Sequence, residues 1–400
     1  MKPALLALLG LAIGTASQAT QTTVSAADRL LHERLLTLDT HLDTPTSFER
    51  TGWRFDQWHE FDFDGTQVDL PRMEQGGLDG GFFVIYTAQG PTTPEAYARV
   101  RDQALLRAMA IQRVVAANPD RLALATTAAD AERLHAHGKR IVYQAIENSY
   151  PLGTDLTLLE TFHKLGVRMA GPVHNGPNQF SDSARGEALH NGLSPLGRRW
   201  VAEMNRLGMV VDGSHASDRA IDQMIALSKT PLILSHHGPD AVLDAPRNIP
   251  DALMRKLARS GGVMQMNTLF LRPTTSADCR DGIEERQKNW EVLSAAERAR
   301  VIADKAVCPA FELADLDLFM RSLLHAVRVM GIDHVGIGAD WDGGGGLSDM
   351  KDISGLPAIT ARLRGAGFSE ADIAKVWSGN VLRLLRAAEA GASANVARRP

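Results

Sequence analysis

Short apolar or β-branched runs alternate with longer helical stretches along most of this 400-residue chain. The helical stretches include residues 93–119, 195–208 and 314–331, and several end at glycine, as helix C-termini often do. Strands that alternate with helices in this way are typical of parallel βα units. The strand-like runs are eight in number and occupy residues 35–42, 80–87, 140–147, 167–174, 209–215, 231–237, 262–267 and 334–340.

Eight βα units predict a closed (β/α)8 TIM-like barrel, in which the active site lies at the C-terminal ends of the strands. An open doubly wound sheet is the alternative, but no GxGxxG motif begins a βα unit to support it. We find no low-complexity linker and no repeat of fixed period, which favours a single domain over residues 20–400. Within it, the charged segment 276–310 is expected to be either a lid over the pocket or a solvated excursion.

The first residues have the features of a secretory signal: one lysine, an apolar stretch over residues 4–13, and small residues up to Ala19. We expect residues 1–19 to be cleaved off, because the apolar stretch is shorter than the ~20 residues of a membrane-spanning helix. An uncleaved anchor is the alternative. The polar, basic C-terminal residues do not form a hydrophobic anchoring signal. The expected product is an exported protein, periplasmic or secreted, without a membrane anchor.

Cys279 and Cys308 flank the charged segment and are the only cysteines of the chain. An even pair in an exported protein predicts either a disulfide or two unpaired thiols, and both readings stay open. A formal net charge of -4 and a pI near 6.4 leave no basic surplus for nucleic acid or an anionic membrane surface. Small molecules are therefore the expected partners. The oligomeric state stays open, with a homodimer as one option.

The stretch TLDTHLDTP places His41 and Asp43 two residues apart at the end of the first predicted strand, so both side chains project from the same face. An isolated pair of this kind is more often a packing histidine beside a helix-capping acid. Ligand-type residues recur, however, at the ends of other predicted strands, namely Glu147, His174, His215, His236 and Asp340. Burying so many such groups without a shared purpose is costly. The pattern predicts a site for zinc or a similar divalent metal, in which Glu147 could bridge two ions.

Seven motifs, in order, resemble those of the membrane dipeptidase (renal dipeptidase) family of the amidohydrolase superfamily. The motifs are DTHLD, AIEN, PVHN, VVDGSH, LILSHH with a following PRN, GIGADWDG and SGNVLRLL. Together they extend from about residue 30 to residue 388, which is nearly all of the expected mature chain.

The resemblance implies a centre of two zinc ions. His41 and Asp43 would hold one ion, and His215 and His236 would hold the second. Glu147 would bridge both ions together with a hydroxide, since a water between two cations loses a proton near neutral pH and becomes a nucleophile. The choice of zinc rests on the resemblance, because these ligand types also bind cobalt and manganese.

The resemblance also implies roles for three residues beside the metals. Asp340, the first acid of DWDG, would be the general acid/base that takes the proton of the nucleophile and passes it to the leaving amine. His174 would contact the substrate carbonyl and its developing oxyanion. Arg247 of PRN would bind the substrate's C-terminal carboxylate, which its planar guanidinium matches. From the residues alone, a surface ion pair is the alternative for Arg247.

Two positions depart from the family pattern or leave a choice. His237 follows His236 where the family usually has a small residue, and only one of two successive strand residues should reach the metals. The motif alignment selects His236. Asp342, the second acid of DWDG, shares the side of Asp340 if the strand continues, and it is a secondary candidate for the acid/base role. The other histidines, such as His32, are expected to be surface or packing residues.

The sequence thus predicts an exported binuclear zinc dipeptidase that acts on dipeptides with a free C-terminal carboxylate. We extend this expectation to L-Xaa-D-Xaa dipeptides. The nearest alternative is another amidohydrolase reaction on the same metal centre, such as hydrolysis of a lactone, a cyclic amide or an N-acyl amino acid. A non-catalytic exported zinc-binding protein is the other alternative, but such a protein has no use for the proton shuttle that Asp340 would provide.

Overall fold

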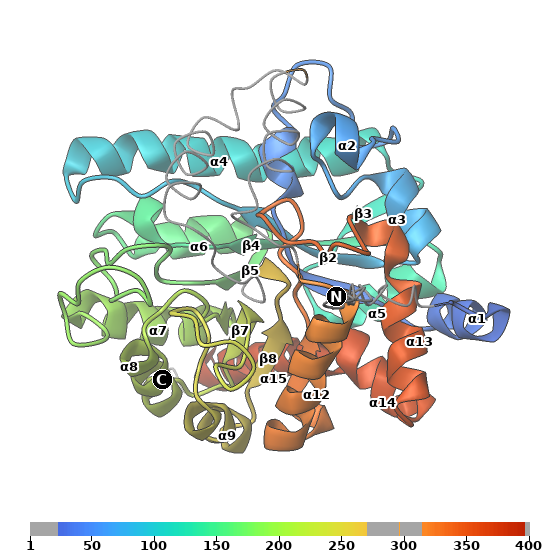
Figure 1. Cartoon of the computed structure of the whole chain (residues 1–400). Coiled ribbons are helices and arrows are strands. Elements are labelled where there is room, and N and C mark those ends of the chain that lie inside the picture. Colours follow the sequence, from blue (N-terminus) through green and yellow to red (C-terminus); the bar gives the residue numbers. More distant parts are fainter. Residues whose placement is uncertain (1–22, 270–295, 297–313, 397–400) are drawn as a thin grey trace, which may run out of the picture.

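Eight parallel strands form the centre of the molecule, and helices surround them (Figure 1). This computed structural model describes residues 23–269, residue 296 and residues 314–396. The eight central strands are β1 (Leu38–Leu42), β2 (Gly80–Ile85), β4 (Arg140–Ile146), β5 (Val167–Ala170), β6 (Val210–Val211), β7 (Ile233–His237), β8 (Val263–Met266) and β9 (Val335–Ile337).

The strands form two sheets that join into one barrel. The first sheet has the order β1-β2-β4-β5-β6 and the second the order β7-β8-β9, and all of these pairs are parallel. A parallel bridge between Asp212 and Ile233 joins β6 to β7. A second parallel bridge, between Leu42 and Trp341, joins β1 to the segment that follows β9. The predicted (β/α)8 barrel is confirmed, and the open doubly wound sheet is excluded.

The sequence pattern does not predict β3 (Leu122–Leu124), which pairs with the first half of β4. This strand lies outside the barrel, because the second half of the same β4 edge pairs with β5. Three residues are too few for an alternating pattern to be recognised in the sequence.

Helices follow the barrel strands and cover their outer side (Figure 1). Thr93 and Ser194 each accept a hydrogen bond from the backbone three residues further on, and a proline follows each of them as the first helical residue. Helix α7 ends at Gly208, whose φ of 73° is the left-handed conformation that glycine adopts at low cost. The helices are α1 (Ala26–Arg34), α2 (Phe61–Asp64), α3 (Leu70–Gly76), α4 (Pro94–Ala117), α5 (Ala128–Ala136), α6 (Thr157–Lys164), α7 (Pro195–Leu207), α8 (Asp218–Leu227), α9 (Asp251–Arg259), α12 (Leu316–Met330), α13 (Pro357–Gly365), α14 (Glu370–Ala374) and α15 (Asn380–Val396), with a π-helical turn, η7 (Lys375–Gly379), before α15.

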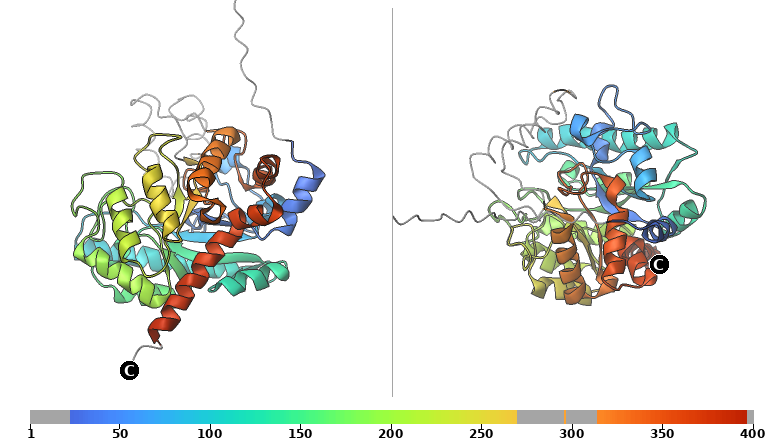
Figure 2. Two further views of the ribbon diagram at one scale, coloured as in Figure 1. Left: turned by 90° about the horizontal axis from the view of Figure 1, so that it is seen from below. Right: turned by 45° about the vertical axis from the view of Figure 1, so that its right-hand side comes forward.

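Helix α15 packs against the N-terminal ends of the strands. Figure 2 shows it running across the molecule in the view from below. Val381, Leu382 and Leu385 of α15 belong to the same buried apolar cluster as Leu38 and Val263, the first residues of β1 and β8. The N-terminal end of the barrel is thereby covered with apolar side chains, and the C-terminal ends of the strands are left as the place for polar chemistry.

A chain of hydrogen bonds through His32 ties α1 to α3, α13 and η7. Trp377 Nε1 donates to Thr360 Oγ1 at 2.8 Å, and Thr360 Oγ1 lies 2.7 Å from His32 Nδ1. His32 Nε2 lies 2.9 Å from the carbonyl oxygen of Gly76, which can only accept. The contact with Gly76 therefore places a ring proton on Nε2, and burial keeps the ring neutral. The expectation of a packing histidine at this position is confirmed.

Several sequence predictions fall on residues outside the described part of the chain. These are the signal over residues 1–19, the segment 276–310 apart from residue 296, and the pair Cys279 and Cys308. They stay predictions. Among the described residues, no helix combines the length and apolar character needed to cross a membrane.

Candidate metal centre

The predicted ligand residues of three strands meet at the C-terminal end of the barrel. His41 lies in β1 with Asp43 just after it, Glu147 follows β4 directly, and His236 lies in β7. All four residues are buried. The backbone N–H of Asp43 donates to the carbonyl oxygen of Trp341 at 2.9 Å. The contact that closes the barrel therefore also fixes the position of the Asp43 backbone.

His215 and Asp340 reach the same place from loops rather than from strands. They lie four residues after β6 and three residues after β9. Both have left-handed backbones, with φ of 66° in each case, and Asp342 has a φ of 64°. Side-chain-bearing residues rarely adopt this conformation, and where they do they cluster at functional sites. The left-handed turns aim both side chains back over the barrel.

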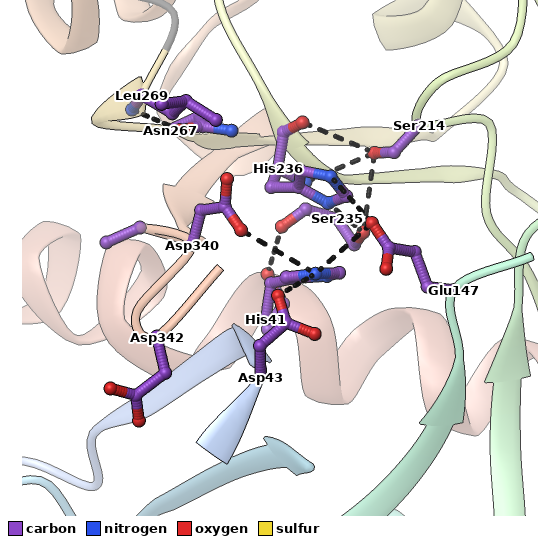
Figure 3. A network of polar contacts seen from close by, with 12 residues as sticks. His41, Asp43, Glu147, Ser214, Ser235, His236, Asn267, Leu269, Asp340 and Asp342 are labelled. Atoms are coloured by element: carbon purple, nitrogen blue, oxygen red, sulfur yellow. Dashed lines mark hydrogen bonds and ion pairs between the residues drawn. The ribbon is translucent and has the colours of Figure 1, made fainter. Parts of the chain in front are cut away.

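One carboxylate oxygen of Glu147 faces four imidazole rings. Its Oε1 atom lies 3.0 Å from Nε2 of His215 and 3.4 Å from Nε2 of His174. The same oxygen lies 3.7 Å from Nε2 of His41 and 3.9 Å from Nε2 of His236. Figure 3 shows the side chains of His41, Glu147 and His236 pointing toward one another. A carboxylate shared by several imidazoles in this way has the position of a bridging ligand between two cations.

Three overlapping groups of side chains have donor atoms close enough to hold an ion. They are His41 with Glu147 and His236, Glu147 with His174 and His215, and His41 with Asp43 and Asp340. Nε2 of His215 and Nε2 of His236 also approach to 2.8 Å. Asp43 Oδ1 is buried and makes no hydrogen bond within the described part of the chain, and His41 Nε2 faces only carboxylate oxygens, of which Asp43 Oδ2 is nearest at 3.2 Å. An unpartnered carboxylate oxygen beside an imidazole nitrogen is what a metal ion would satisfy, so the residues fit the predicted metal centre.

The electrostatics of the acidic side of the site favour a cation. Burial raises the pKa of Glu147 well above its usual value, the charge of Asp43 adds to this, and His41 opposes it. Burial lowers the pKa of His41, but the charge of Asp43, with those of Glu147 and Asp340, outweighs burial and raises it to about 10. A bound cation would offset the negative charge of these carboxylates and compete with the proton of His41.

The imidazoles on the other side of the site are held neutral. Burial, followed by the positive charge of Arg247, lowers the pKa of His174 to about 3 and that of His215 well below its usual value. Burial and the charge of His41 do the same for the pKa of His236. A neutral imidazole keeps the nitrogen lone pair that a metal ion requires.

Arg247 is fully buried beside His215. Its guanidinium nitrogen Nη1 lies 2.6 Å from Nδ1 and 2.8 Å from Nε2 of His215, and Nη2 donates to the carbonyl oxygen of His236 at 3.3 Å. Burial lowers the pKa of Arg247 to about 9, although nearby carboxylates oppose this. The alternative reading of a surface ion pair is therefore wrong, and Arg247 lies within the site.

His174 is held at the rim of the site by its backbone. Its N–H donates to the side-chain oxygen of Gln89 at 2.9 Å, and its carbonyl oxygen accepts from Ser183 Oγ at 2.6 Å. The imidazole lies edge-on to Tyr86, with ring centroids 5.2 Å apart. His174 keeps 21% of its side chain exposed. It is thus more accessible than the other site histidines, which suits a group that meets substrate.

The structure distinguishes Asp340 from Asp342 and His236 from His237, the two choices that the motifs left open. Both oxygens of Asp342 are occupied, Oδ1 by the backbone N–H of Gln67 at 2.6 Å and Oδ2 by the hydroxyl of Thr44 at 2.6 Å. Figure 3 shows this side chain pointing away from the site. The secondary acid/base reading of Asp342 is wrong, because the strand ends at Ile337 and its alternation does not reach residue 342. His237 is buried but belongs to none of the ion-holding groups formed by the described residues.

Sequence reasoning missed several residues that support the site. Asp39 accepts from the backbone N–H groups of His41 and Ala339 at 2.9 Å and 3.1 Å, and burial raises the pKa of its carboxyl to about 7. Asp212 and Ser235 hydrogen-bond to each other next to His236. All three stand inside the quoted motifs DTHLD, VVDGSH and LILSHH. Their presence in the motifs could have marked these residues as candidates. Spacing along one strand, however, does not reveal hydrogen-bond partners that lie on a neighbouring strand.

The barrel, with buried imidazoles and carboxylates at the C-terminal ends of its strands, has the fold and the type of site found in metal-dependent hydrolases. An amidohydrolase from Pseudomonas aeruginosa shares the fold at 20% identity and a TM-score of 0.67. A sequence profile of the membrane dipeptidase family (peptidase family M19) matches residues 25–399. The chain therefore belongs to the membrane dipeptidase family, and it is a metallo-dipeptidase of that family.

Relatives and solved structures agree with this assignment. The chain is 30% identical over 329 residues to dipeptidase tcpJ of Claviceps purpurea. The matched region covers 80% of this chain and 69% of that relative. It is similar to the crystal structure of the probable dipeptidase PvdM from Pseudomonas aeruginosa, with 30% identity, a TM-score of 0.79, and 91% and 98% of the two chains covered. A metallo peptidase from Rhodobacter sphaeroides, solved with a phosphinate mimic of the dipeptide L-Ala-D-Ala, has 28% identity and a TM-score of 0.71, with 88% and 99% covered.

Proposed function

We propose that this protein hydrolyses dipeptides with a free C-terminal carboxylate, L-Xaa-D-Xaa dipeptides included, and that it uses two zinc ions. The observation that carries the proposal is the position of Glu147 Oε1, which four imidazole Nε2 atoms approach within 3.0 to 3.9 Å. A shared carboxylate between two sets of ligands is what a pair of ions requires. The L-Ala-D-Ala mimic bound by the Rhodobacter sphaeroides relative supports the stereochemical part of the proposal.

The ligand set is proposed as follows. His41 and Asp43 would hold one ion, His215 and His236 would hold the other, and Glu147 would serve both. When bound, the two ions supply Lewis acidity and lower the pKa of a coordinated water. The choice of zinc rests on the family, because imidazole and carboxylate ligands accept zinc but also bind cobalt and manganese.

Asp340 is proposed to move the proton in the reaction. Its Oδ1 atom lies 3.8 Å from His41 Nε2, which places a carboxylate at the edge of the ligand set. It accepts a proton from the attacking water as the new carbon–oxygen bond forms. It then returns that proton to the amine nitrogen as the peptide carbon–nitrogen bond breaks.

His174 and Arg247 are proposed to bind the substrate. The Nε2 atom of His174 faces Glu147 Oε1 at 3.4 Å, an arrangement in which a neutral ring donates its N–H into the site. The same donor would stabilise negative charge on the substrate carbonyl oxygen in the transition state. Arg247 is buried and positively charged, and its planar group matches the free carboxylate of a dipeptide.

We also propose that the protein acts outside the cytoplasm, periplasmic or secreted. The support is the sequence of residues 1–19, with its lysine, apolar stretch and small residues before the expected cleavage point. Fractionation of cells that express the full chain, with sequencing of the mature N-terminus, tests this proposal. A protein that stays in the cytoplasm with residues 1–19 intact would contradict it.

The decisive experiment measures metal content and substrate range together. The purified protein is tested on L-Ala-L-Ala, L-Ala-D-Ala and an N-acylated dipeptide, before and after chelation and after return of zinc. Two equivalents of metal and chelator-sensitive cleavage of the free dipeptides are expected. Bound metal with turnover of the N-acylated compound alone would favour another amidohydrolase reaction. Intact L-Ala-D-Ala beside cleaved L-Ala-L-Ala would end the stereochemical part of the proposal.

A substitution at Arg247 tests how the substrate is recognised. Arg247→Ala is expected to lower kcat/KM for L-Ala-L-Ala roughly 10- to 100-fold, the value of a lost charged hydrogen bond of about 1.5–3 kcal/mol. Cleavage of L-Ala-L-Ala amide, which lacks the carboxylate, should change little. Arg255→Ala, at an exposed arginine of α9, is the matched control and should leave both rates unchanged. Equal losses on both substrates would contradict the proposed role.

A further inference from the structure

We propose that Asp212 is a positioning residue of the metal centre, and that it acts on His236 through the hydroxyl of Ser235. The inference rests on the proposed function, because it treats His236 as a metal ligand. Asp212 directly follows β6, and Ser235 and His236 are neighbours in β7. All three are buried, with at most 2% of each exposed. Their hydrogen bonds are therefore shielded from water.

The contacts form an unbroken chain from the carboxylate to the imidazole. Ser235 Oγ donates to Asp212 Oδ2 at 2.5 Å, and Ser235 Oγ lies 2.9 Å from His236 Nδ1. The other carboxylate oxygen, Oδ1, accepts from the backbone N–H groups of Ser214 at 2.9 Å and Ser235 at 3.0 Å. Figure 3 shows Ser235 beside His236, whose ring extends toward Glu147.

The number of available protons determines which atom donates and which accepts in each of these hydrogen bonds. A carboxylate can only accept, so the single hydroxyl proton of Ser235 belongs to the bond with Asp212. The Ser235 oxygen must then accept from His236, which places the imidazole proton on Nδ1. In a neutral ring this leaves the lone pair on Nε2, the atom that lies 3.9 Å from Glu147 Oε1 and 2.8 Å from His215 Nε2. Asp212 thus selects the tautomer in which His236 binds a metal ion.

Asp212 also belongs to the junction between the two sheets. Its backbone makes the isolated bridge to Ile233 that joins β6 to β7, and its carboxylate binds the β7 backbone at Ser235. Loss of the carboxylate would therefore weaken the barrel as well as release His236. A test must separate these effects, and Ser235 offers the means. Its side chain carries the link to His236, while the two backbone bonds of Asp212 do not depend on it.

The test is the zinc affinity of Ser235→Ala, measured by competition with a chromophoric chelator on the full-length protein. Affinity for one of the two ions is expected to fall roughly 10- to 100-fold, the usual effect of losing a group that orients a ligand. The thermal midpoint of the metal-free protein should change little. Asp212→Asn should weaken the same ion at least as much. Its amide can donate to Ser235, reverse the chain and place the proton on Nε2.

Two further variants complete the design. Ser322→Ala removes a buried serine hydroxyl in α12, away from the site, and should keep both ions at wild-type affinity. Ser235→Thr restores the hydroxyl and should restore the affinity. Wild-type affinity for both ions in Ser235→Ala would overturn the inference, whether or not Asp212→Asn folds. A wild-type protein that binds no zinc would instead overturn the proposed function, and the positioning role with it, so the two failures are distinguishable.

Discussion

Glu147 presents a single oxygen to four imidazole rings, and this crowding explains much of the chemistry of the site at the scale of residues. The carboxylates of two neighbouring residues, Asp340 and Asp342, have different surroundings. Asp340 faces His41 at 3.8 Å, whereas both oxygens of Asp342 are bound by Thr44 and Gln67. Two acids of one short motif thus have separate tasks, one in the site and one in the loop that supports it.

Asp340 can be tested as a proton carrier against the alternative that it is a ligand. Asp340→Asn should lower kcat for dipeptides by about 10²–10⁴-fold, the usual worth of a general acid or base, while both metal equivalents remain. Activity and metal content are measured on the same preparation. Loss of one metal equivalent would make Asp340 a ligand, as its grouping with His41 and Asp43 also allows.

Gly343 lies where a side chain would separate two site carboxylates. A Cβ atom there would come within 3.0 Å of Asp43 Oδ2 and Asp340 Oδ1, a spacing that such atoms do not adopt. Gly343→Ala should therefore lower kcat/KM at least about 10-fold, because a displaced reacting group is costly to catalysis. Gly365→Ala, in open space on α13, is the control and should leave kcat/KM unchanged. Wild-type kinetics in Gly343→Ala would show that the carboxylates move aside freely.

At the scale of elements, the strands could be predicted from the sequence and the site loops could not. The eight apolar runs correspond to the eight barrel strands. A parallel strand is buried on both faces, so its consecutive residues are mostly apolar and the strand can be recognised in the sequence. Convergence of His41, Glu147 and His236 follows from that order. The left-handed backbone conformations at His215 and Asp340 cannot be predicted from the residue types around them. Strand alternation therefore predicted correctly that Asp340 lies beside His41 but wrongly that Asp342 shares its side.

The buried His32 that links α1 to three other elements makes stability depend on pH. Burial lowers its pKa in the folded protein to about 4, against 6.5 in the unfolded chain, although hydrogen bonds oppose this. The unfolded chain therefore takes up a proton between pH 6.5 and pH 4 while the folded protein does not. This contribution to stability is full above about pH 6.5 and is lost as the pH falls toward 4. It amounts to about 3 kcal/mol.

His32→Gln should remove that part of the pH dependence. The free energy of unfolding, measured with denaturant from pH 7.5 to 4.5, should fall less steeply with acid than in the wild type. His137→Gln, at an exposed histidine, should retain the wild-type slope. Parallel curves for wild type and His32→Gln would contradict the assignment.

At the scale of the whole molecule, the metal centre and the fold depend on each other. The carboxylates of Asp43, Glu147 and Asp340 are buried together, and their mutual repulsion is relieved by a bound cation. Ligand binding to the folded state alone adds about 4 kcal/mol when free metal is a thousand times the dissociation constant. The barrel is thus expected to be appreciably more stable with its ions than without them.

Removal of metal should therefore lower the thermal midpoint by roughly 5–10 °C, as expected for several kcal/mol in a chain of this size. Differential scanning calorimetry with and without a chelator measures the shift. Return of zinc should restore the midpoint, and magnesium, which prefers oxygen ligands, should not. Identical midpoints for the treated and untreated protein would mean that the ions contribute nothing to the fold.

The bridge between Leu42 and Trp341 has a consequence for how the molecule is made. It joins the first strand of the barrel to the segment after the last, and His41, Asp43 and Asp340 meet across it. A growing chain carries His41 and Asp43 from early in synthesis and gains Asp340 only near its end. The site around His41 is therefore complete only once the barrel closes. Interrupted chains lack both Asp340 and the closing bridge at Trp341.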